Sequence, residues 1–353
     1  MKIGILNFYY SNNNYGAVLQ AYALRNMIKG MGYEAEIINF RNSPYSLKAL
    51  VDIYKKYKEP DNPFEAFRRN HLGIKKFGLF FPFQLKSLVS RYDAFVVGSD
   101  QVWRPDHSRI HRYFFYLSFV PDDKLKISYA ASFGKDYWDC QDKEYTRKAK
   151  QLIQRFDAIS LREKSGCDIC QDLFKVDCSQ VLDPVLLGGE DVFKKITNPK
   201  SHKSRVVYYL LDKPSFKEDI LEIAEASFQE KPVNIHFAGT KGAPCYYDVE
   251  QWLDYIRDAD LIITDSFHCI CFSIIFKKKF ICVLNEKRGV ARLKDLFSDL
   301  SISGCIYDGT NFNSVIENTI DYNKVDSTLK ELRDKSYNFL KQALSINQHH
   351  HKD

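Results

Sequence analysis

The stretch LIITDSFHCICFSIIFKKKF, residues 261–280, joins two apolar runs through a short polar segment. The first run is short and rich in branched residues, which is typical of a buried strand, and we interpret the second as a helix capped by Asp265 or Ser266. His268 then lies in the first helical turn. Because ligands of parallel α/β sheets collect beyond the carboxyl ends of the strands, these polar groups are candidates for ligand binding.

The same alternation of strand and helix continues on both sides of this stretch. Helical patterns separate several apolar runs, as over 15–31, where Val18, Ala21 and Leu24 fall on one face. We predict strands at 2–8, 35–40, 93–99, 125–133, 157–162, 180–187, 205–211, 233–239, 261–266 and 280–285. This order predicts an α/β fold with two Rossmann-like, doubly wound domains that face each other across a cleft.

The alternation restarts after Gly188 and Gly189, which can adopt the backbone angles that a hinge requires. We therefore predict an N-terminal domain over 1–187, with a helical insertion near 42–90 that breaks the alternation. A C-terminal domain follows over 188–325. The remaining residues, 326–353, are expected to form a helix that crosses back to the first domain, and a polar tail.

Composition limits the class of function. The 353 residues are 45% hydrophobic, enough for two moderate cores, and 51 basic against 45 acidic residues give a net charge of +6 without an arginine-rich tract. This balance suits a small anionic substrate and argues against nucleic acid as a partner. No apolar run reaches the about 18 residues of a membrane span, so any membrane attachment would be peripheral, at the inner surface.

Nine cysteines, an odd number, and an N-terminus without signal-peptide features predict a reduced, cytoplasmic protein. Cys167 and Cys170, followed by Cys178, have a spacing that also occurs in zinc sites. No second close pair of Cys or His follows at ligand spacing, so we predict no metal site.

The segment NNNYGAVLQ, residues 12–20, connects the first strand to the first helix. Asn14 is a candidate N-cap, and Gly16 lets the backbone approach a ligand. Together with Tyr15 and Gln20, these residues could bind a sugar. The alternative is a capped turn with no ligand.

The segment VVGSDQVW, residues 96–103, ends a strand in a dense set of hydrogen-bonding groups. Ser99, Asp100 and Gln101 are candidates for ligand binding, and Trp103 could stack on a sugar face. The alternative is a polar turn with a tryptophan in the core.

Two charged residues follow later strands of the first domain. Arg162, between a strand and a helix, could grip a carboxylate or phosphate through two parallel hydrogen bonds, or it could form a salt bridge to a neighbouring acid. Asp183 precedes Pro184, which favours an extended backbone. We interpret Asp183 as a structural corner between the domains rather than as a catalytic acid.

Cationic residues accompany His268 in the second domain. Lys287, Arg288 and Arg292 follow the strand at 280–285 and could form a rim for an anion, although a solvated charge cluster is the default interpretation. His268 is a candidate general acid/base because it begins a helix whose remainder is apolar. A lone histidine with a structural role is the alternative.

Six segments in this order and spacing resemble the polysaccharide pyruvyl transferase family: NNNYGAVLQAYAL, VVGSDQVW, SYAASFG, ISLREKSG, VLDPVLL and ADLIITDSFHCICFSIIF. The resemblance runs from about residue 1 to 300. It implies a two-domain fold of the GT-B type. It also implies transfer of a group from phosphoenolpyruvate to a sugar of a cell-surface polysaccharide, which forms a pyruvate ketal.

The resemblance places the family's late motif of Arg, an aromatic residue or Leu, and His on Ser266, Phe267 and His268, so Ser replaces the Arg. Arg162, Arg288 or Arg292 would then supply the missing charge. Catalysis is assigned to His268 and Asp100. We expect the donor at Arg162, Ser266, Lys287, Arg288 and Arg292, and the acceptor at Asn14, Tyr15, Gly16, Gln20, Ser99, Gln101 and Trp103.

This chemistry requires no metal and no cofactor besides phosphoenolpyruvate as co-substrate. The acceptor would be a sugar or a lipid-linked oligosaccharide. Two other functions stay open on the sequence. One is a GT-B glycosyltransferase with a nucleotide-sugar donor, because the fold does not separate the two activities. The other is a catalytically silent glycan-binding protein.

Overall fold

The computed structural model describes residues 1–11, 13–39, 62–74, 84–105, 113–198, 204–212, 217–238, 245–285 and 290–346. The chain divides into two compact units, which we describe separately. Unit 1 comprises Met1–Pro184 and Lys335–Asp353, and unit 2 comprises Val185–Asp334. The division falls three residues before the predicted boundary at residue 187.

Unit 1 contains a six-stranded sheet in the order β2-β1-β3-β4-β5-β6, and all of its pairings are parallel. Its strands are β1 (Lys2–Leu6), β2 (Glu34–Ile37), β3 (Ala94–Val97), β4 (Leu125–Ala131), β5 (Ala158–Leu161) and β6 (Ser179–Gln180). Because β1 is flanked by β2 on one side and β3 on the other, the strand order reverses at β1. The carboxyl ends of β1 and β3 therefore form the topological switch point, where such sheets bind ligands.

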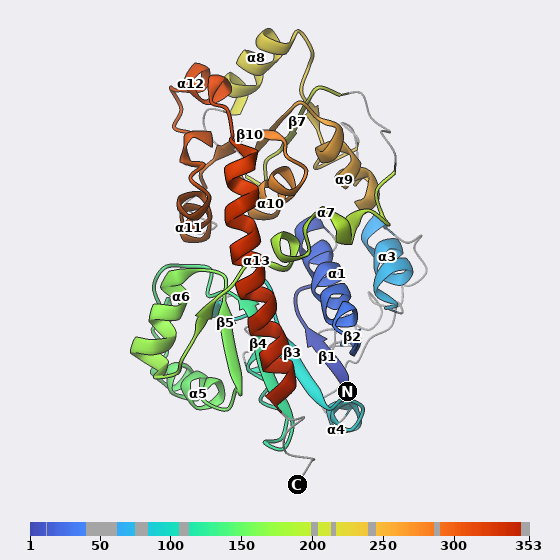
Figure 1. Cartoon of the computed structure of the whole chain (residues 1–353), viewed down its shortest axis with the longest axis vertical. Coiled ribbons are helices and arrows are strands. Elements are labelled where there is room, and N and C mark those ends of the chain that lie inside the picture. Colours follow the sequence, from blue (N-terminus) through green and yellow to red (C-terminus); the bar gives the residue numbers. More distant parts are fainter. Residues whose placement is uncertain are drawn as a thin grey trace, which may run out of the picture. The chain divides into compact units, whose positions relative to one another are not determined.

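Helices connect the strands of unit 1 (Figure 1). They are α1 (Tyr15–Gly30), α3 (Pro63–Phe67), α4 (Gln84–Val89), α5 (Lys143–Ile153) and α6 (Lys164–Ile169). The described residues of unit 1 also form two π-helical segments, Arg68–Leu72 and Cys170–Phe174, and a 3-10 turn at Phe114–Tyr116. Within the predicted insertion near 42–90, residues 62–74 and 84–90 are described and are mostly helical, and the other positions lie outside the described residues.

Unit 2 has a second sheet of parallel strands, in the order β11-β10-β9-β7-β8. The strands are β7 (Val206–Tyr209), β8 (Val233–Asn234), β9 (Leu261–Thr264), β10 (Lys279–Val283) and β11 (Ile306–Tyr307). The order reverses at β7, so the carboxyl ends of β7 and β9 form the switch point of this unit. The two residues of β11 were too few to produce a strand signal in the sequence.

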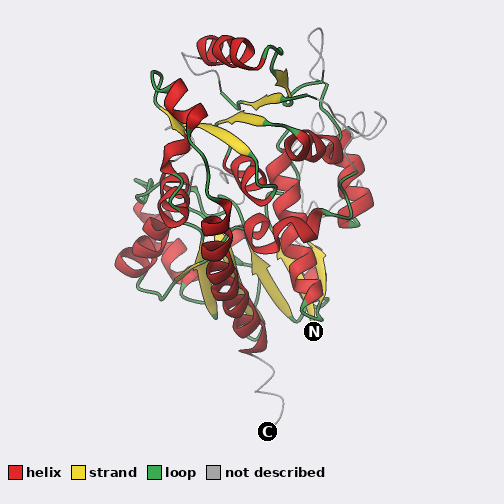
Figure 2. Ribbon diagram, turned by 45° about the horizontal axis from the view of Figure 1, so that its top comes forward, coloured by secondary structure: helices red, strands yellow, loops and turns green. Residues whose placement is uncertain are grey.

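The helices of unit 2 are α7 (Pro184–Phe193), α8 (Lys217–Phe228), α9 (Val249–Asp258), α10 (Phe267–Ile275), α11 (Ala291–Leu300), α12 (Phe312–Glu317) and α13 (Tyr322–Ser345). Figure 2 shows helices packed around the strands. The first residue of α7, Pro184, is still counted in unit 1. The last helix, α13, begins in unit 2 and ends in unit 1, because Lys335 and the following residues belong to unit 1.

The predicted strand at 180–187 is wrong beyond its first residue. β6 ends at Gln180, and α7 begins at Pro184, whose fixed φ and missing N–H suit the first turn of a helix. The glycine pair lies within α7, where Gly189 has a φ of 60° and interrupts the helical backbone.

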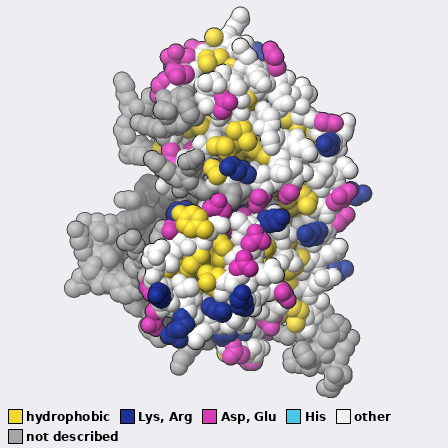
Figure 3. All heavy atoms as spheres, turned by 90° about the vertical axis from the view of Figure 1, so that its left-hand side faces the viewer, with side chains coloured by type: hydrophobic (Ala, Val, Ile, Leu, Met, Phe, Trp, Pro, Cys, Tyr) yellow, Lys and Arg dark blue, Asp and Glu magenta, His cyan; other side chains and the backbone are white. Residues whose placement is uncertain are grey.

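The strands are buried because parallel sheets are covered on both faces. Every residue of β3, β4 and β9 is buried. On the face shown in Figure 3, the Lys and Arg side chains are interspersed with Asp and Glu. This mixture agrees with the modest net charge of +6.

Candidate functional site

The loop after β3 has a backbone shape that few residues can adopt. Gly98 has a φ of 114°, and a Cβ at this position would lie 2.1 Å from the Tyr129 carbonyl oxygen. Asp100 has a φ of 78°, which is uncommon for a residue with a side chain, and it forms an isolated parallel bridge with Ala131 of β4. Such conformations cost free energy and cluster at functional sites, so this loop is the first candidate in unit 1.

Arg162, directly after β5, lies at the centre of a buried ionic network. Its guanidinium donates hydrogen bonds from Nη2 to Asp100 Oδ1 at 2.8 Å and from Nη1 to Asp183 Oδ2 at 3.2 Å. Only 1% of the arginine side chain is exposed. Glu163 is a third carboxylate, 4.0 Å from Arg162 Nε. Burial by itself would lower the pKa of Arg162, but the three carboxylates more than offset this effect and raise it.

Neutral side chains extend this network to α1. Ser99 Oγ lies 3.2 Å from Asp183 Oδ2 and 3.0 Å from Gln20 Oε1, while Gln20 Nε2 donates to the Ala17 carbonyl at 2.8 Å. Ser99 and Gln20 have no exposed surface. The network therefore fixes the loop after β3 against α1, β5 and the segment that precedes α7.

Two sequence predictions change as a result. Arg162 forms the salt bridge that was its alternative interpretation, with both terminal nitrogens bonded to carboxylates of its own unit. Gln20 and Ser99, which were predicted to contact the acceptor, lie in the interior, where Ser99 is bonded to Gln20 and Asp183. Asp183 was interpreted as a structural corner, and it does lie in the interior, but as the shared partner of Arg162 and Ser99.

Asp100 is the member of this network that reaches the surface, since 12% of its side chain is exposed. Tyr10 lies in the loop after β1, near that carboxylate. Burial and the negative charge of Asp100 raise the pKa of the Tyr10 phenol to about 12. The phenol is therefore neutral at physiological pH, and 39% of the residue is exposed. Tyr10 is not among the residues predicted from the sequence, because a tyrosine in an aromatic loop carries no distinguishing pattern.

The predictions for the start of α1 have mixed outcomes. Asn14 is the N-cap, as predicted, and its Oδ1 accepts a hydrogen bond from Ala17 N at 3.2 Å. Tyr15 is fully buried, with its ring centroid 4.8 Å from that of Phe64, and Gly16 is buried beside it. The buried ring of Tyr15 belongs to the core and is not placed for direct contact with an acceptor.

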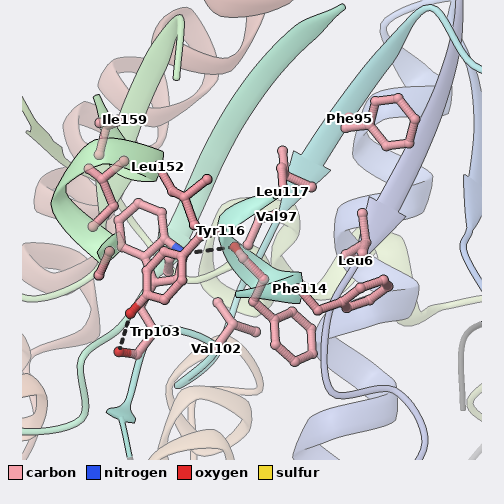
Figure 4. Close-up of a cluster of buried hydrophobic side chains, with 14 of the residues drawn as sticks. Leu6, Phe95, Val97, Val102, Trp103, Phe114, Tyr116, Leu117, Leu152 and Ile159 are labelled. Atoms are coloured by element: carbon pink, nitrogen blue, oxygen red, sulfur yellow. Dashed lines mark hydrogen bonds between the residues drawn. The ribbon is translucent and has the colours of Figure 1, made fainter. Parts of the chain in front are cut away.

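Trp103 also belongs to the core, and its predicted sugar contact is corrected. Figure 4 shows the indole inside the apolar cluster, stacked on Tyr116 at a centroid distance of 5.7 Å. Its Nε1 donates to the Phe115 carbonyl at 3.0 Å, and the Tyr116 hydroxyl donates to the Trp103 carbonyl at 3.2 Å. Trp103 has no exposed surface, so its buried indole anchors the loop after β3 to the core. Nearby Gln101 is 8% exposed, and its Oε1 accepts a hydrogen bond from Arg104 Nη1 at 3.0 Å.

In unit 2, Asp265 links the carboxyl ends of three strands. Its Oδ1 accepts a hydrogen bond from Leu211 N at 2.8 Å, and its Oδ2 accepts from Asp212 N at 3.2 Å, both just after β7. Asn285, after β10, donates from Nδ2 to Asp265 Oδ2 at 3.1 Å and to Asp212 Oδ2 at 2.5 Å. Asp265 thus orders the edge of the sheet at which α10 begins.

Ser266 is the N-cap of α10, with its Oγ accepting a hydrogen bond from Cys269 N at 3.4 Å. All nine residues of this helix are buried, as its apolar sequence predicted. His268 lies in the first turn and is 7% exposed. Amide N–H groups at a helix start have no intrahelical partner and favour negative charge, so this turn suits an anion.

Arg292, in the first turn of α11, lies next to this turn. Its guanidinium carbon is 5.2 Å from the ring centroid of Phe267, and that ring is 5.4 Å from the imidazole of His268. The structure therefore brings one cation of the predicted rim to the Ser266–His268 motif. Lys287 and Arg288, the other two predicted cations, lie outside the described residues.

The described residues lack two features that bear on the class of protein. Among these residues, no group of three or more His, Cys, Asp and Glu side chains is placed to hold a metal ion. In the same part of the chain, no helix is long and apolar enough to span a membrane.

Two parallel-sheet α/β units in one chain define a fold of the GT-B type, and solved structures share it. The UDP-GlcNAc 2-epimerase of Methanocaldococcus jannaschii aligns with a TM-score of 0.50 and 13% identity, over 98% of this chain and 100% of the other. The UDP-GlcNAc 2-epimerase of Neisseria meningitidis gives 0.50 and 9%, over 98% and 100%. At such low identity the likeness concerns the fold alone.

The family is shown by the sequence. The model of the polysaccharide pyruvyl transferase family matches residues 14–287, which is most of the chain and includes the loop after β3 and the Ser266–His268 motif. No curated protein matches the sequence significantly. The chain belongs to the polysaccharide pyruvyl transferase family, which is a family of transferases.

Proposed function

We propose that this protein transfers a pyruvyl group from phosphoenolpyruvate to a sugar of a cell-surface polysaccharide or of its lipid-linked precursor. In this reaction the methylene carbon of phosphoenolpyruvate gains a proton and one sugar hydroxyl attacks the adjacent carbon. Phosphate then leaves, and a second hydroxyl closes the ketal. The products are the pyruvate ketal and inorganic phosphate. The scheme requires no metal and no further cofactor, and we place it in the cytoplasm or at the inner face of the membrane.

The observation that carries this proposal is the position of Arg292 beside the Ser266–His268 motif. The family motif has an arginine where this chain has Ser266. Of the three arginines that could replace it, Arg162 is bonded to Asp100 and Asp183 within unit 1, and Arg288 lies outside the described residues. The Arg292 guanidinium lies over the ring of Phe267, which belongs to the motif. We therefore assign to Arg292 the contact with the carboxylate or phosphate of the donor.

His268 would then act as the general acid/base of the reaction. An imidazole in the first turn of α10 is adjacent to the amide groups that suit the anionic donor. It can donate the proton that the methylene carbon gains, or accept the proton of the attacking hydroxyl. The buried remainder of α10 fixes the orientation of the ring.

Asp100 is the group that we propose for the acceptor. Its carboxylate is held by Arg162, and part of it is exposed, so it can accept a hydrogen bond from a sugar hydroxyl without moving. Preorganisation of this kind lowers the entropic cost of binding. The donor is thereby assigned to unit 2 and the acceptor to unit 1.

A thermal-shift panel tests the class of donor. Phosphoenolpyruvate at about 100 times its Kd should stabilise the protein by about 2.7 kcal/mol, whereas UDP and GDP should have no effect. Phosphate release from phosphoenolpyruvate should further require a sugar with two suitably spaced hydroxyls. Stabilisation by UDP or GDP instead would indicate a glycosyltransferase, and stabilisation by oligosaccharide alone would indicate a glycan-binding protein.

A further inference from the structure

Three cysteines of unit 1 converge in the connection between β5 and β6. Cys167 lies in α6, and Cys170, one helical turn later, begins the π-helical segment. The chain then reverses at Lys175, which has a φ of 58°, and Val176 N donates back to the Cys170 carbonyl at 3.2 Å. This reversal returns Cys178 to the helix. All three cysteines pack on the same apolar cluster.

The thiols are close enough to interact with one another. Hydrogen bonds with the Cys167 and Cys170 thiols, and then burial, raise the pKa of Cys178 well above its usual range. Cys178 therefore keeps its proton at physiological pH. Cys170 is buried, whereas Cys167 and Cys178 are partly exposed, so an oxidant can reach these two.

We infer that Cys167 and Cys178 are a reversible oxidation site, at which a hydroperoxide converts the two thiols into a disulfide. The Cys167 sulfur attacks the peroxide oxygen, the O–O bond breaks, and Cys167 becomes a sulfenic acid, while the thiol proton passes to the leaving oxygen, which departs as an alcohol or water. Cys178 sulfur then displaces the hydroxyl of the sulfenic acid, which leaves as water with the thiol proton. Two electrons pass from the thiols to the peroxide. A dithiol reductant restores both thiols.

The placement of this site links it to the buried network. The connection that contains the three cysteines starts after Arg162 and Glu163 and ends shortly before Asp183. Arg162 and Asp183 form a salt bridge, and both cysteines lie in the segment between them. A disulfide from Cys167 to Cys178 would therefore cross-link this segment. Oxidation therefore acts on the segment that positions Asp100. The site itself does not depend on the proposed activity.

Thiol mapping of the full-length protein tests the inference. The reduced protein is treated with hydrogen peroxide, alkylated, digested and analysed by mass spectrometry. We expect a cross-linked peptide pair that contains Cys167 and Cys178 and disappears after dithiothreitol. Cys245 is an exposed thiol of unit 2 and serves as the internal control. It should react with the peroxide but form no intramolecular cross-link.

A variant separates the two chemical steps. In Cys178→Ser, oxidation should stop at the sulfenic acid of Cys167, which dimedone labels, while Cys245→Ser should cross-link as the wild type does. The inference is overturned if Cys167 and Cys178 remain alkylatable once Cys245 has been oxidised, or if Cys167 pairs with Cys170. It is also overturned if a tightly bound metal ion protects all three thiols until a chelator removes it.

Discussion

His268 begins a helix whose side chains are buried, and its ring lies beside Phe267 at the edge of the sheet in unit 2. We expect His268→Gln, which keeps the volume of the side chain, to lower turnover by about 100-fold or more, because a general acid/base contributes that much. The melting temperature should change little. Ser273→Ala is the control for stability on the same helix. It removes the 2.9 Å hydrogen bond from Ser273 Oγ to the Cys269 carbonyl and leaves His268 unchanged. A destabilised His268→Gln protein with nearly full turnover would make this histidine structural.

Arg292 gives the second prediction at this scale. If its guanidinium binds the donor, Arg292→Gln should remove about 1.5 to 3 kcal/mol of binding free energy, which weakens phosphoenolpyruvate binding by about 10- to 150-fold. Lys294→Gln makes the same change of charge at an exposed position of α11 and should leave the affinity unchanged. Isothermal titration calorimetry measures both variants. Equal affinities in the two would remove Arg292 from the site.

At the scale of the element, the loop after β3 depends on Gly98. In Gly98→Ala the new Cβ would lie 2.1 Å from the Tyr129 carbonyl oxygen at a φ of 114°, so the loop and β4 would have to move. We expect a loss of at least about 2 kcal/mol of unfolding free energy. Gly30→Ala, at the end of α1, meets no atom within 4 Å and should gain about 0.5 to 1 kcal/mol. Urea denaturation compares the two, and similar stabilities would contradict the assigned role of Gly98.

The connection from β5 to α7 gives a further prediction. Removing one partner of a buried ion pair costs about 3–5 kcal/mol, so Arg162→Gln should destabilise the protein by that amount and leave phosphoenolpyruvate affinity unchanged. The variant retains three carboxylates, and protonation relieves their mutual repulsion. Its deficit relative to wild type should therefore shrink as the pH falls from 7 to 5. Lys148→Gln, at an exposed position, should show neither effect. Weakened donor binding in a stable Arg162→Gln protein would restore the predicted donor contact.

At the scale of the whole molecule, the proposed division of substrates can be read from amide hydrogen exchange. Phosphoenolpyruvate should slow exchange at the start of α10 and in the first turn of α11, both in unit 2. A sugar acceptor should instead slow exchange at 98–101, after β3 of unit 1. Helix α12, which contains none of the residues assigned to either substrate, serves as the internal control. Protection of 98–101 by phosphoenolpyruvate, without protection of α10, would reverse the assignment.

The sequence by itself determined the fold, because hydrophobic periodicity and the order of elements are local properties. Strand and helix alternate as predicted, and the polar residues Asp265 and Ser266 do separate β9 from α10. The π-helical segments and the two-residue strand β11 escaped prediction, since so few residues give no periodic signal. The start of α7 was missed because an apolar run of that length suits a strand or a helix equally.

Only the tertiary structure decided which polar and aromatic residues are buried and which keep an exposed surface. Arg162 has its carboxylates 62 and 21 positions away in the chain, and the Trp103 indole bonds a carbonyl 12 residues later. No local pattern records such partners, so an arginine for a ligand and an arginine for a salt bridge look alike in sequence. Burial has the same origin, because a side chain is covered by elements from elsewhere in the chain. The sequence therefore predicted the edges of both sheets as candidate sites, and the tertiary contacts are the reason why we propose Asp100 and Arg292 at those edges.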